Sequence, residues 1–235
     1  MNRRNGLTNE EYFDKVQGMT EESSTTTRPP GLIFISLSGK KQVGKDTATD
    51  IATRLLRDVG KTVKVTAFAE PLKRMCIDVL GLEEALVYGS NDDKDTLTHI
   101  VWDTMPLNIR VKYSKVTRGP RSGAMTVREV LQVVGTDIFR EMFWDNVWAE
   151  APFRKDYADV DVVILTDCRF PNEKDCTDGS GGVTIRLERA TGFTDNHKSE
   201  TALDGYTFEY FYENNGSLED LEIFIRETLE EIELL

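Results

Sequence analysis

The chain switches repeatedly between segments with short continuous apolar runs and segments whose apolar residues recur every three or four positions. Runs of the first kind are typical of buried strands, and they fall at residues 32–38, 61–70, 160–167, 182–189 and 206–214. Segments compatible with helices fall at residues 45–59, 71–81 and 217–232. Strands separated by helices predict an α/β fold in which a mainly parallel, five-stranded sheet has helices on both faces.

The middle of the chain departs from this alternation. Residues 83–123 carry charges, Trp102, prolines and glycines without a period, so we expect an insertion or a lid-like excursion there. Thr126 and Glu129 then form a capping-box signature. The apolar residues that follow recur at helical spacing, at Val127, Val130, Leu131, Val134, Ile138 and Met142. We therefore predict one long amphipathic helix from residue 126 onward.

The composition limits the organisation and the class of protein. A polar leader, residues 1–30, ends in two prolines and should be flexible, whereas residues 31–235 suffice for one domain with a sizeable core. The net charge of −12 disfavours sequence-independent nucleic-acid binding, and no apolar stretch reaches the ~20 residues that span a bilayer. No secretory signal is visible and the three cysteines are odd in number, so we expect a cytoplasmic protein with reduced thiols. The sequence leaves monomer and homodimer equally open.

A glycine-rich segment follows the first apolar run directly. In SGKKQVGKDT, residues 38–47, the residues Gly39, Gly44 and Lys45 satisfy the spacing G-x-x-x-x-G-K between a predicted strand and a predicted helix. Such a loop, which here includes Lys41 and Val43, turns its backbone N–H groups toward a phosphate, and its lysine reaches the outer phosphates. The alternative is an ordinary glycine-rich turn without a ligand.

Asp46 follows the lysine, at the position where a magnesium-binding hydroxyl is usual. A carboxylate is also a hard oxygen ligand for Mg²⁺, and Thr47 offers a hydroxyl one position later. The alternative is that Asp46 only caps the helix or pairs with a loop lysine. The sequence leaves both interpretations open.

Two further groups of polar residues are candidates for a binding site. Asp167 and Arg169 follow a predicted strand at its carboxyl end, where parallel sheets hold their ligands. The carboxylate suits magnesium or the attacking group and the guanidinium suits phosphate, although both residues could form only a local ion pair. On the long helix, polar residues recur at every fourth position and form one ridge, namely Arg128, Gln132, Thr136 and Arg140. This ridge is either a binding face or a solvated face.

Other candidates carry a weaker signal. Three cations could surround a transferred phosphoryl group, although each alone is typical of a surface charge: Lys73, Arg186 and Arg189. His99 and His197 lack the spacing of metal ligands. Phe68 fits the core better than it fits base stacking.

These segments together resemble a known family, the deoxynucleoside monophosphate kinases of tailed bacteriophages. The likeness covers nearly everything after residue 31 and rests on segments in the family's order, namely SGKKQVGKDT, FAEPLK, YGSNDDKDTLTHIVWDTMP, MTVREVLQVVGTDIFREMFWDNVW, TDCRFPNE, HKSETALD and NNGSLEDL. The resemblance implies a three-layer P-loop kinase fold with a substrate-side insertion at 83–123 and a lid-like segment at 189–204. The leader is longer than the family suggests, and TDGSGGV shortens the helix expected before residue 182.

The resemblance also implies roles for particular residues. Catalysis would involve Lys45, Asp167, Arg169 and Arg189. Mg²⁺ would be held by Asp46, Thr47 and Asp167, and the phosphates of ATP would lie on residues 39–47. The monophosphate would be bound by Phe68, Lys73, Arg128, Gln132, Asp137, Arg140 and Arg169, while Arg186, Arg189 and His197 would act from the lid.

The activity implied is transfer of the γ-phosphoryl group of ATP to a deoxynucleoside 5′-monophosphate, giving the diphosphate for DNA precursor supply. One alternative is a related kinase that acts on phosphomevalonate or on a modified base in DNA. The other alternative is a nucleotide-binding regulator without catalysis. Neither stable nucleic-acid binding nor a membrane role is expected.

Overall fold

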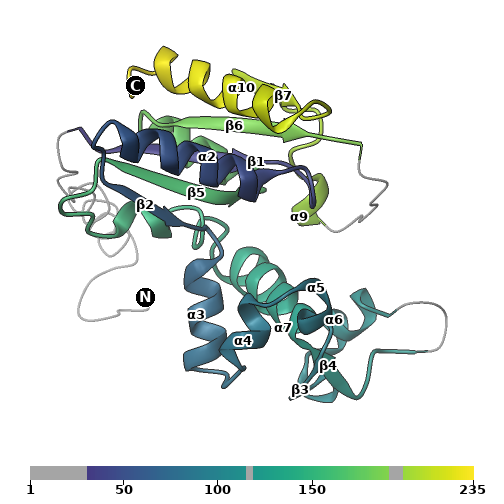
Figure 1. Cartoon of the computed structure of the whole chain (residues 1–235). Helices are drawn as coiled ribbons and strands as arrows, with labels where there is room; N and C mark the ends of the chain where they lie inside the picture. The colour runs from purple at the N-terminus through teal and green to yellow at the C-terminus, as the bar shows by residue number, and fades with distance from the viewer. Residues whose placement is uncertain (1–30, 115–118, 191–197) are drawn as a thin grey trace, which may run out of the picture.

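The computed structural model describes residues 31–114, 119–190 and 198–235 (Figure 1). The predicted leader and residues 191–197 of the predicted lid lie outside the described residues. The main sheet has five parallel strands in the order β2-β5-β1-β6-β7. Their bounds are β1 Ile33–Ser38, β2 Val63–Thr66, β5 Val162–Cys168, β6 Val183–Glu188 and β7 Tyr210–Glu213. The prediction of a parallel, five-stranded α/β sheet is confirmed.

Helices cover both faces of this sheet, which gives three layers. On one face, α2 (Lys45–Asp58) packs against the sheet and α10 (Leu218–Glu231) packs beside α2 (Figure 1). Alternate β1 residues Ile35 and Leu37 point into this apolar layer. Phe34 points into the opposite layer. There α8 (Pro171–Gly179) covers β1 and β6, and η3 (Ala151–Arg154) brings further apolar side chains.

The residues predicted to form an aperiodic insertion fold around an apolar core of their own, which they share with α3 (Glu70–Asp78) and with the helix beginning at residue 127. Trp102 and Met125 are fully enclosed in this core. Figure 1 shows these elements grouped together on one side of the main sheet. They are α4 (Glu84–Tyr88), α5 (Asn91–Lys94), the antiparallel pair β3 (Leu97–Val101) and β4 (Ala124–Thr126), η1 (Trp102–Thr104) and α6 (Leu107–Lys112).

The predicted long helix begins where expected but changes its winding. The capping box of Thr126 and Glu129 starts α7 (Val127–Gln132), and the chain then continues as a π-helix, η2 (Val133–Phe143). The predicted long helix therefore runs on to Phe143, but its winding changes from α to π after Gln132. The first turn of the π-helix packs closely against its surroundings: a Cβ on Gly135 would lie 2.5 Å from Leu72, and the carbonyl of Gly135 accepts a 2.9 Å hydrogen bond from the Trp148 indole. These tertiary contacts are absent from any local propensity.

Two further properties of the described residues concern the cysteines and the length of the helices. Cys76, Cys168 and Cys176 are free thiols, and the first two are buried. Within these same residues, no helix combines the length and the apolar character that a bilayer span requires.

Candidate active site

The glycine-rich segment forms a tight loop between β1 and α2. Gly39 and Gly44 have φ angles of 146° and 98°, a region in which side-chain-bearing residues are strained. A Cβ on Gly39 would lie 2.5 Å from the carbonyl oxygen of Leu187. The amide of Asn214, just after β7, donates a 2.8 Å hydrogen bond to the carbonyl of Val43 and fills the space beside Gly44. Both glycines are therefore required by the loop's geometry.

Lys45 at the start of α2 reaches back across this loop. Its ammonium group donates hydrogen bonds to the carbonyl oxygens of Gly39 at 2.7 Å and Lys40 at 2.8 Å. Burial, followed by the nearby Arg169 guanidinium, lowers the pKa of Lys45 to about 8. Three carboxylates act on this pKa in the opposite direction, those of Glu200, Asp46 and Asp167. The Lys45 ammonium group therefore lies close to charged side chains from three places: the start of α2, the end of β5 and the segment that carries Glu200.

Asp167, near the end of β5, is fixed by the chain that follows β2. Its two carboxylate oxygens accept backbone hydrogen bonds from Phe68 at 2.6 Å and from Ala69 at 3.1 Å. Because Ala69 is the N-cap of α3, these bonds satisfy donors at the start of that helix. The Phe68 side chain itself is 1% exposed and faces Phe153 in the core. Phe68 thus contributes its backbone to the site, and its ring lies outside the cavity described next.

A cavity of about 370 Å³ opens beside the phosphate loop, between α3, α5 and the α7–η2 helix. Six basic side chains line it, those of Lys41, Lys73, Lys94, Arg128, Arg140 and Arg169. Its apolar wall consists of Leu72, Leu131, Trp148 and Phe170. Three carboxylates complete the charged lining, those of Asp167, Glu173 and Glu200. The excess of cations makes this cavity suited to an anionic ligand.

The predicted ridge runs along this cavity, since all four of its residues line the wall. Residues four positions apart drift around an α-helix of 3.6 residues per turn. The wider π turns reverse this drift, which keeps Thr136 and Arg140 on the same face as Arg128 and Gln132. Arg128 also donates to the carboxylate of Asp95 at 2.8 Å, which ties the end of α5 to α7. The ridge is therefore not a plain solvated face.

Arg140 and Glu173 form a buried ion pair in the lining of the cavity. Arg140 also stacks over the Phe170 ring, 4.1 Å from its centroid, and donates to the Asn172 side chain at 3.3 Å. Burial raises the pKa of Glu173 to about 7, against the opposing effect of the Arg140 charge. The Glu173 carboxylate additionally accepts the backbone N–H of Arg169 at 2.7 Å. The pair thus shapes the turn that presents Arg169.

Arg169 lies where the cavity meets the phosphate loop. Its guanidinium forms an ion pair with Glu200, a residue of α9 (Lys198–Thr201). The other oxygen of that carboxylate accepts the backbone N–H of Lys41 at 3.2 Å. Lys41 belongs to the loop and also lines the cavity, so the two parts of the site share this junction.

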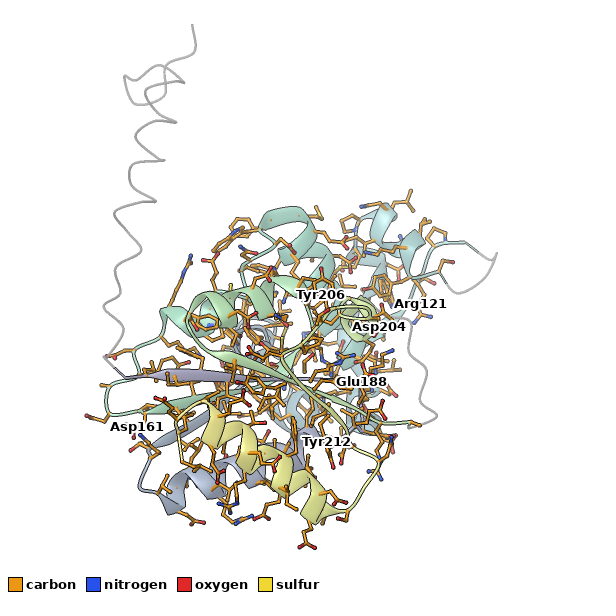
Figure 2. All side chains as sticks on the ribbon, turned by 90° about the horizontal axis from the view of Figure 1, so that it is seen from above. Arg121, Asp161, Glu188, Asp204, Tyr206 and Tyr212 are labelled. Carbon is orange, nitrogen blue, oxygen red and sulfur yellow. The ribbon has the colours of Figure 1, made fainter. Side chains whose placement is uncertain are left out.

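Four residues that the sequence assigned to the site lie elsewhere among the described residues. Asp137 turns toward α6, where it accepts hydrogen bonds from Lys112 at 2.5 Å and Tyr113 at 2.8 Å. Arg186, expected in the lid, is instead a buried residue of β6 that pairs with Glu188 and Asp204. Figure 2 labels these two acidic residues. Arg189 is exposed beyond β6. Phe68 is the fourth, and His197 lies outside the described residues.

Several lining residues were not singled out by the sequence. Lys94 and Asn91 come from α5, Glu173 from α8, Glu200 from α9 and Trp148 from a loop. Asn214, which contacts the phosphate loop outside the cavity lining, was missed as well. The signal that could have found Lys94, Glu173 and Glu200 was present, because each lies inside a segment that carries the family resemblance. The spacing of these three residues along the sequence does not by itself indicate a binding site.

The oxygen donors near Lys45 fit a magnesium ion. Asp46 is exposed in the first turn of α2, Thr47 is half-buried next to it, and the Asp167 carboxylate is held in place by two amides. No group of three or more potential His, Cys, Asp or Glu ligands occurs within residues 31–114, 119–190 and 198–235. Magnesium commonly takes only one or two protein carboxylates, with water and substrate phosphates completing its octahedron. The donor set therefore fits Mg²⁺ held together with a nucleotide.

Comparisons with known proteins point to one family. The family model described as deoxynucleotide monophosphate kinase matches residues 82–225, which is more than half of the chain. A protein of Acanthamoeba polyphaga mimivirus named "Putative deoxynucleotide monophosphate kinase" is 28% identical over 204 residues, covering 80% of this chain and 92% of that protein. The deoxynucleoside-5′-monophosphate kinase of Escherichia phage T5 is 43% identical over 49 residues, covering 20% of this chain and 19% of its own length.

Proposed function

Since the chain belongs to the deoxynucleotide monophosphate kinase family, we propose that it transfers the γ-phosphoryl group of ATP to a deoxynucleoside 5′-monophosphate. The family predicted from the sequence segments is confirmed, and the chain is accordingly a phosphotransferase. One observation carries the proposal: Lys41 belongs to the phosphate loop and also lines the cationic cavity. A donor on the loop and an acceptor in the cavity would meet at this residue. The viral relatives support a role in DNA precursor supply in the cytoplasm of a host cell.

The lining of the cavity offers both kinds of contact that a nucleotide needs. Basic side chains from α3, α5 and α7, those of Lys73, Lys94 and Arg128, would hold the acceptor phosphate. The apolar wall formed by Leu131, Trp148 and Phe170 would take the base. Gln132 and Thr136 lie along the same ridge and would supply hydrogen bonds to the base or sugar.

For phosphoryl transfer, the protein mainly has to align the donor with the acceptor and to neutralise the charge on the phosphates. A phosphate monoester has a second pKa near 6, so the acceptor oxygen is already anionic at neutral pH and needs no general base. This oxygen bonds to the γ-phosphorus as the bond to the bridging oxygen breaks, and the electron pair leaves with ADP. Lys45 and Arg169 would neutralise the charge that develops on the transferred group. Mg²⁺, held by Asp46, Thr47 and Asp167, would supply further neutralisation of the phosphate oxygens.

The proposal is tested by an acceptor screen in which ADP formation is coupled to an optical signal. The acceptors are the four common deoxynucleoside monophosphates, their ribose counterparts, phosphomevalonate and duplex DNA. Turnover on at least one deoxynucleoside monophosphate above the rates for phosphomevalonate and DNA supports the proposal. Turnover confined to phosphomevalonate or DNA, or ATP binding without turnover on any acceptor, overturns it.

The magnesium assignment predicts that loss of the Asp46 carboxylate changes the magnesium requirement of the reaction, whereas loss of the Asp50 carboxylate does not. Asp46→Ala should raise the Mg²⁺ concentration that gives half-maximal turnover by about tenfold or more, because a carboxylate that already acts on Lys45 would be lost from the metal. Asp50→Ala removes an exposed carboxylate one turn later on α2 and serves as the control. A magnesium titration checks this. If Thr47→Ala shifts the titration further than Asp46→Ala does, the hydroxyl is the main ligand.

The lowered pKa of Lys45 predicts a pH dependence of nucleotide binding. In the free protein the ammonium form is lost as the pH rises through about 8. Because the charged form attracts phosphate, the affinity for ATP should weaken as the pH rises from about 7 through about 8 and above. Calorimetric titration across this range measures the effect, and Lys45→Met should remove most of it. An affinity that stays constant or increases above pH 8 in the wild type would contradict the assignment.

A further inference from the structure

The carboxylate of Glu200 is enclosed by groups that bind phosphate. Its side chain is 3% exposed although it belongs to the short helix α9. One oxygen pairs with the guanidinium of Arg169 and the other accepts the N–H of Lys41 at 3.2 Å. The same carboxylate is close enough to Lys45 to oppose the lowering of its pKa. A loop amide, a guanidinium and an ammonium group therefore surround one buried anion.

This arrangement resembles the surroundings of a phosphoryl group more than those of a structural carboxylate. Phosphate loops bind anions through backbone N–H groups, and arginine matches carboxylate and phosphate with the same planar fork. Lys41 and Arg169 both line the acceptor cavity at its junction with the loop. The Glu200 carboxylate contacts both residues and itself lines the cavity, so a group bound between the loop and the cavity would come close to it. Two anions cannot share that place without a large electrostatic cost.

We propose that Glu200 occupies the position of the γ-phosphoryl group in the nucleotide-free protein and thereby makes the donor site distinguish ATP from ADP. This inference rests on the proposed function, because it assumes that the loop binds ATP. ATP has to displace the carboxylate from Lys41 and Arg169, and its γ-phosphoryl group then takes over both contacts. ADP has no group at that position and leaves Glu200 in place. Glu200 thus lowers the affinity for the donor without lowering that for the product.

A second acidic residue of the same segment provides a control. Asp204 pairs with the Lys40 side chain at 2.9 Å and lies 3.6 Å from the Arg186 guanidinium. Its side chain is 44% exposed and it is not among the residues that line the cavity. Asp204→Asn removes the same charge from the same side of the loop. A general charge effect would therefore change ATP and ADP binding alike in this variant.

The test is calorimetric measurement of the dissociation constants of MgATP and MgADP without acceptor. Glu200→Gln should lower the dissociation constant of ATP by about tenfold, while that of ADP should change by less than about twofold. Glu200→Ala should give the same ATP-specific gain, so the test survives if one neutral variant does not fold. Glu200→Asp keeps the charge and should stay closer to the wild-type ratio, and Asp204→Asn should leave the ratio unchanged.

The outcomes distinguish a failure of the proposed role of Glu200 from a failure of the proposed kinase function. Equal changes for ATP and ADP in the neutral variants, or weaker ATP binding, would overturn the role of Glu200 while leaving a wild-type protein that phosphorylates deoxynucleoside monophosphates. Wild-type protein that binds neither nucleotide would overturn the proposed function and this inference with it.

Discussion

Replacing Lys45 by methionine should lower kcat/KM for the preferred acceptor by about 10²- to 10³-fold, which is the usual effect of removing one preorganised charge-stabilising group. Methionine keeps the length and the apolar stem of lysine and removes only the ammonium group. The protein should remain folded, because burial has already lowered the pKa of Lys45 to about 8. At pH 7 the folded state bears the cost of this buried charge, and the substitution removes that cost.

A neighbouring lysine provides the control for this substitution. Lys40 lies in the same loop, but its side chain is 44% exposed and pairs with Asp204. Lys40→Met should change kcat/KM by less than about fivefold, since an exposed ion pair contributes little. Steady-state kinetics with both variants tests the assignment. Equal losses in the two variants would show a general effect of loop charge and no special role for Lys45.

Arg140→Met should destabilise the fold by about 3–5 kcal/mol, because it leaves the Glu173 carboxylate buried without its cation. The side chains of Arg140 and Glu173 are 6% and 3% exposed. Loss of the cation also removes the charge that holds down the pKa of Glu173, so part of the cost will appear as proton uptake. Urea unfolding at neutral pH measures the change in the free energy of unfolding.

The double variant Arg140→Met with Glu173→Gln isolates the unpaired charge from other effects. It should recover most of the lost stability, whereas Arg154→Met, which breaks an exposed pair with Glu150, should cost at most about 1 kcal/mol. A loss below about 1 kcal/mol for Arg140→Met would mean that Arg140 has little structural role. In that case its position in the cavity would point to direct contact with the acceptor.

Local patterns predicted the parts of the site that are continuous in sequence. The strand before Gly39 and the helix beginning at Lys45 fix the loop between them, so the spacing of three residues was sufficient to place it. The ridge residues Arg128 and Arg140 were recognised for the same reason, as positions on one helix. The π winding between them was not predictable, because π turns are rare and the apolar spacing of this segment also fits an α-helix.

Residues that reach the site from distant segments could not be placed from their spacing. Glu200 is 159 positions from the amide that it contacts, and Asn214 is 171 positions from the carbonyl to which it donates. Only the folded sheet, in which β1, β6 and β7 lie side by side, brings such groups together. Packing of α6 against the helix in the second apolar core likewise turned Asp137 away from the cavity, although Asp137 shares a helix with the ridge.

The most direct measurement follows the transferred phosphorus atom. Wild-type protein is incubated with Mg²⁺, ATP labelled in its γ-phosphoryl group and the deoxynucleoside monophosphate preferred in the acceptor screen, and the products are separated. The structure and the family predict that the label appears at the β-position of the deoxynucleoside diphosphate, with one ADP formed for each. Label found only in unreacted ATP or in inorganic phosphate would contradict transfer between the phosphate loop and the cavity.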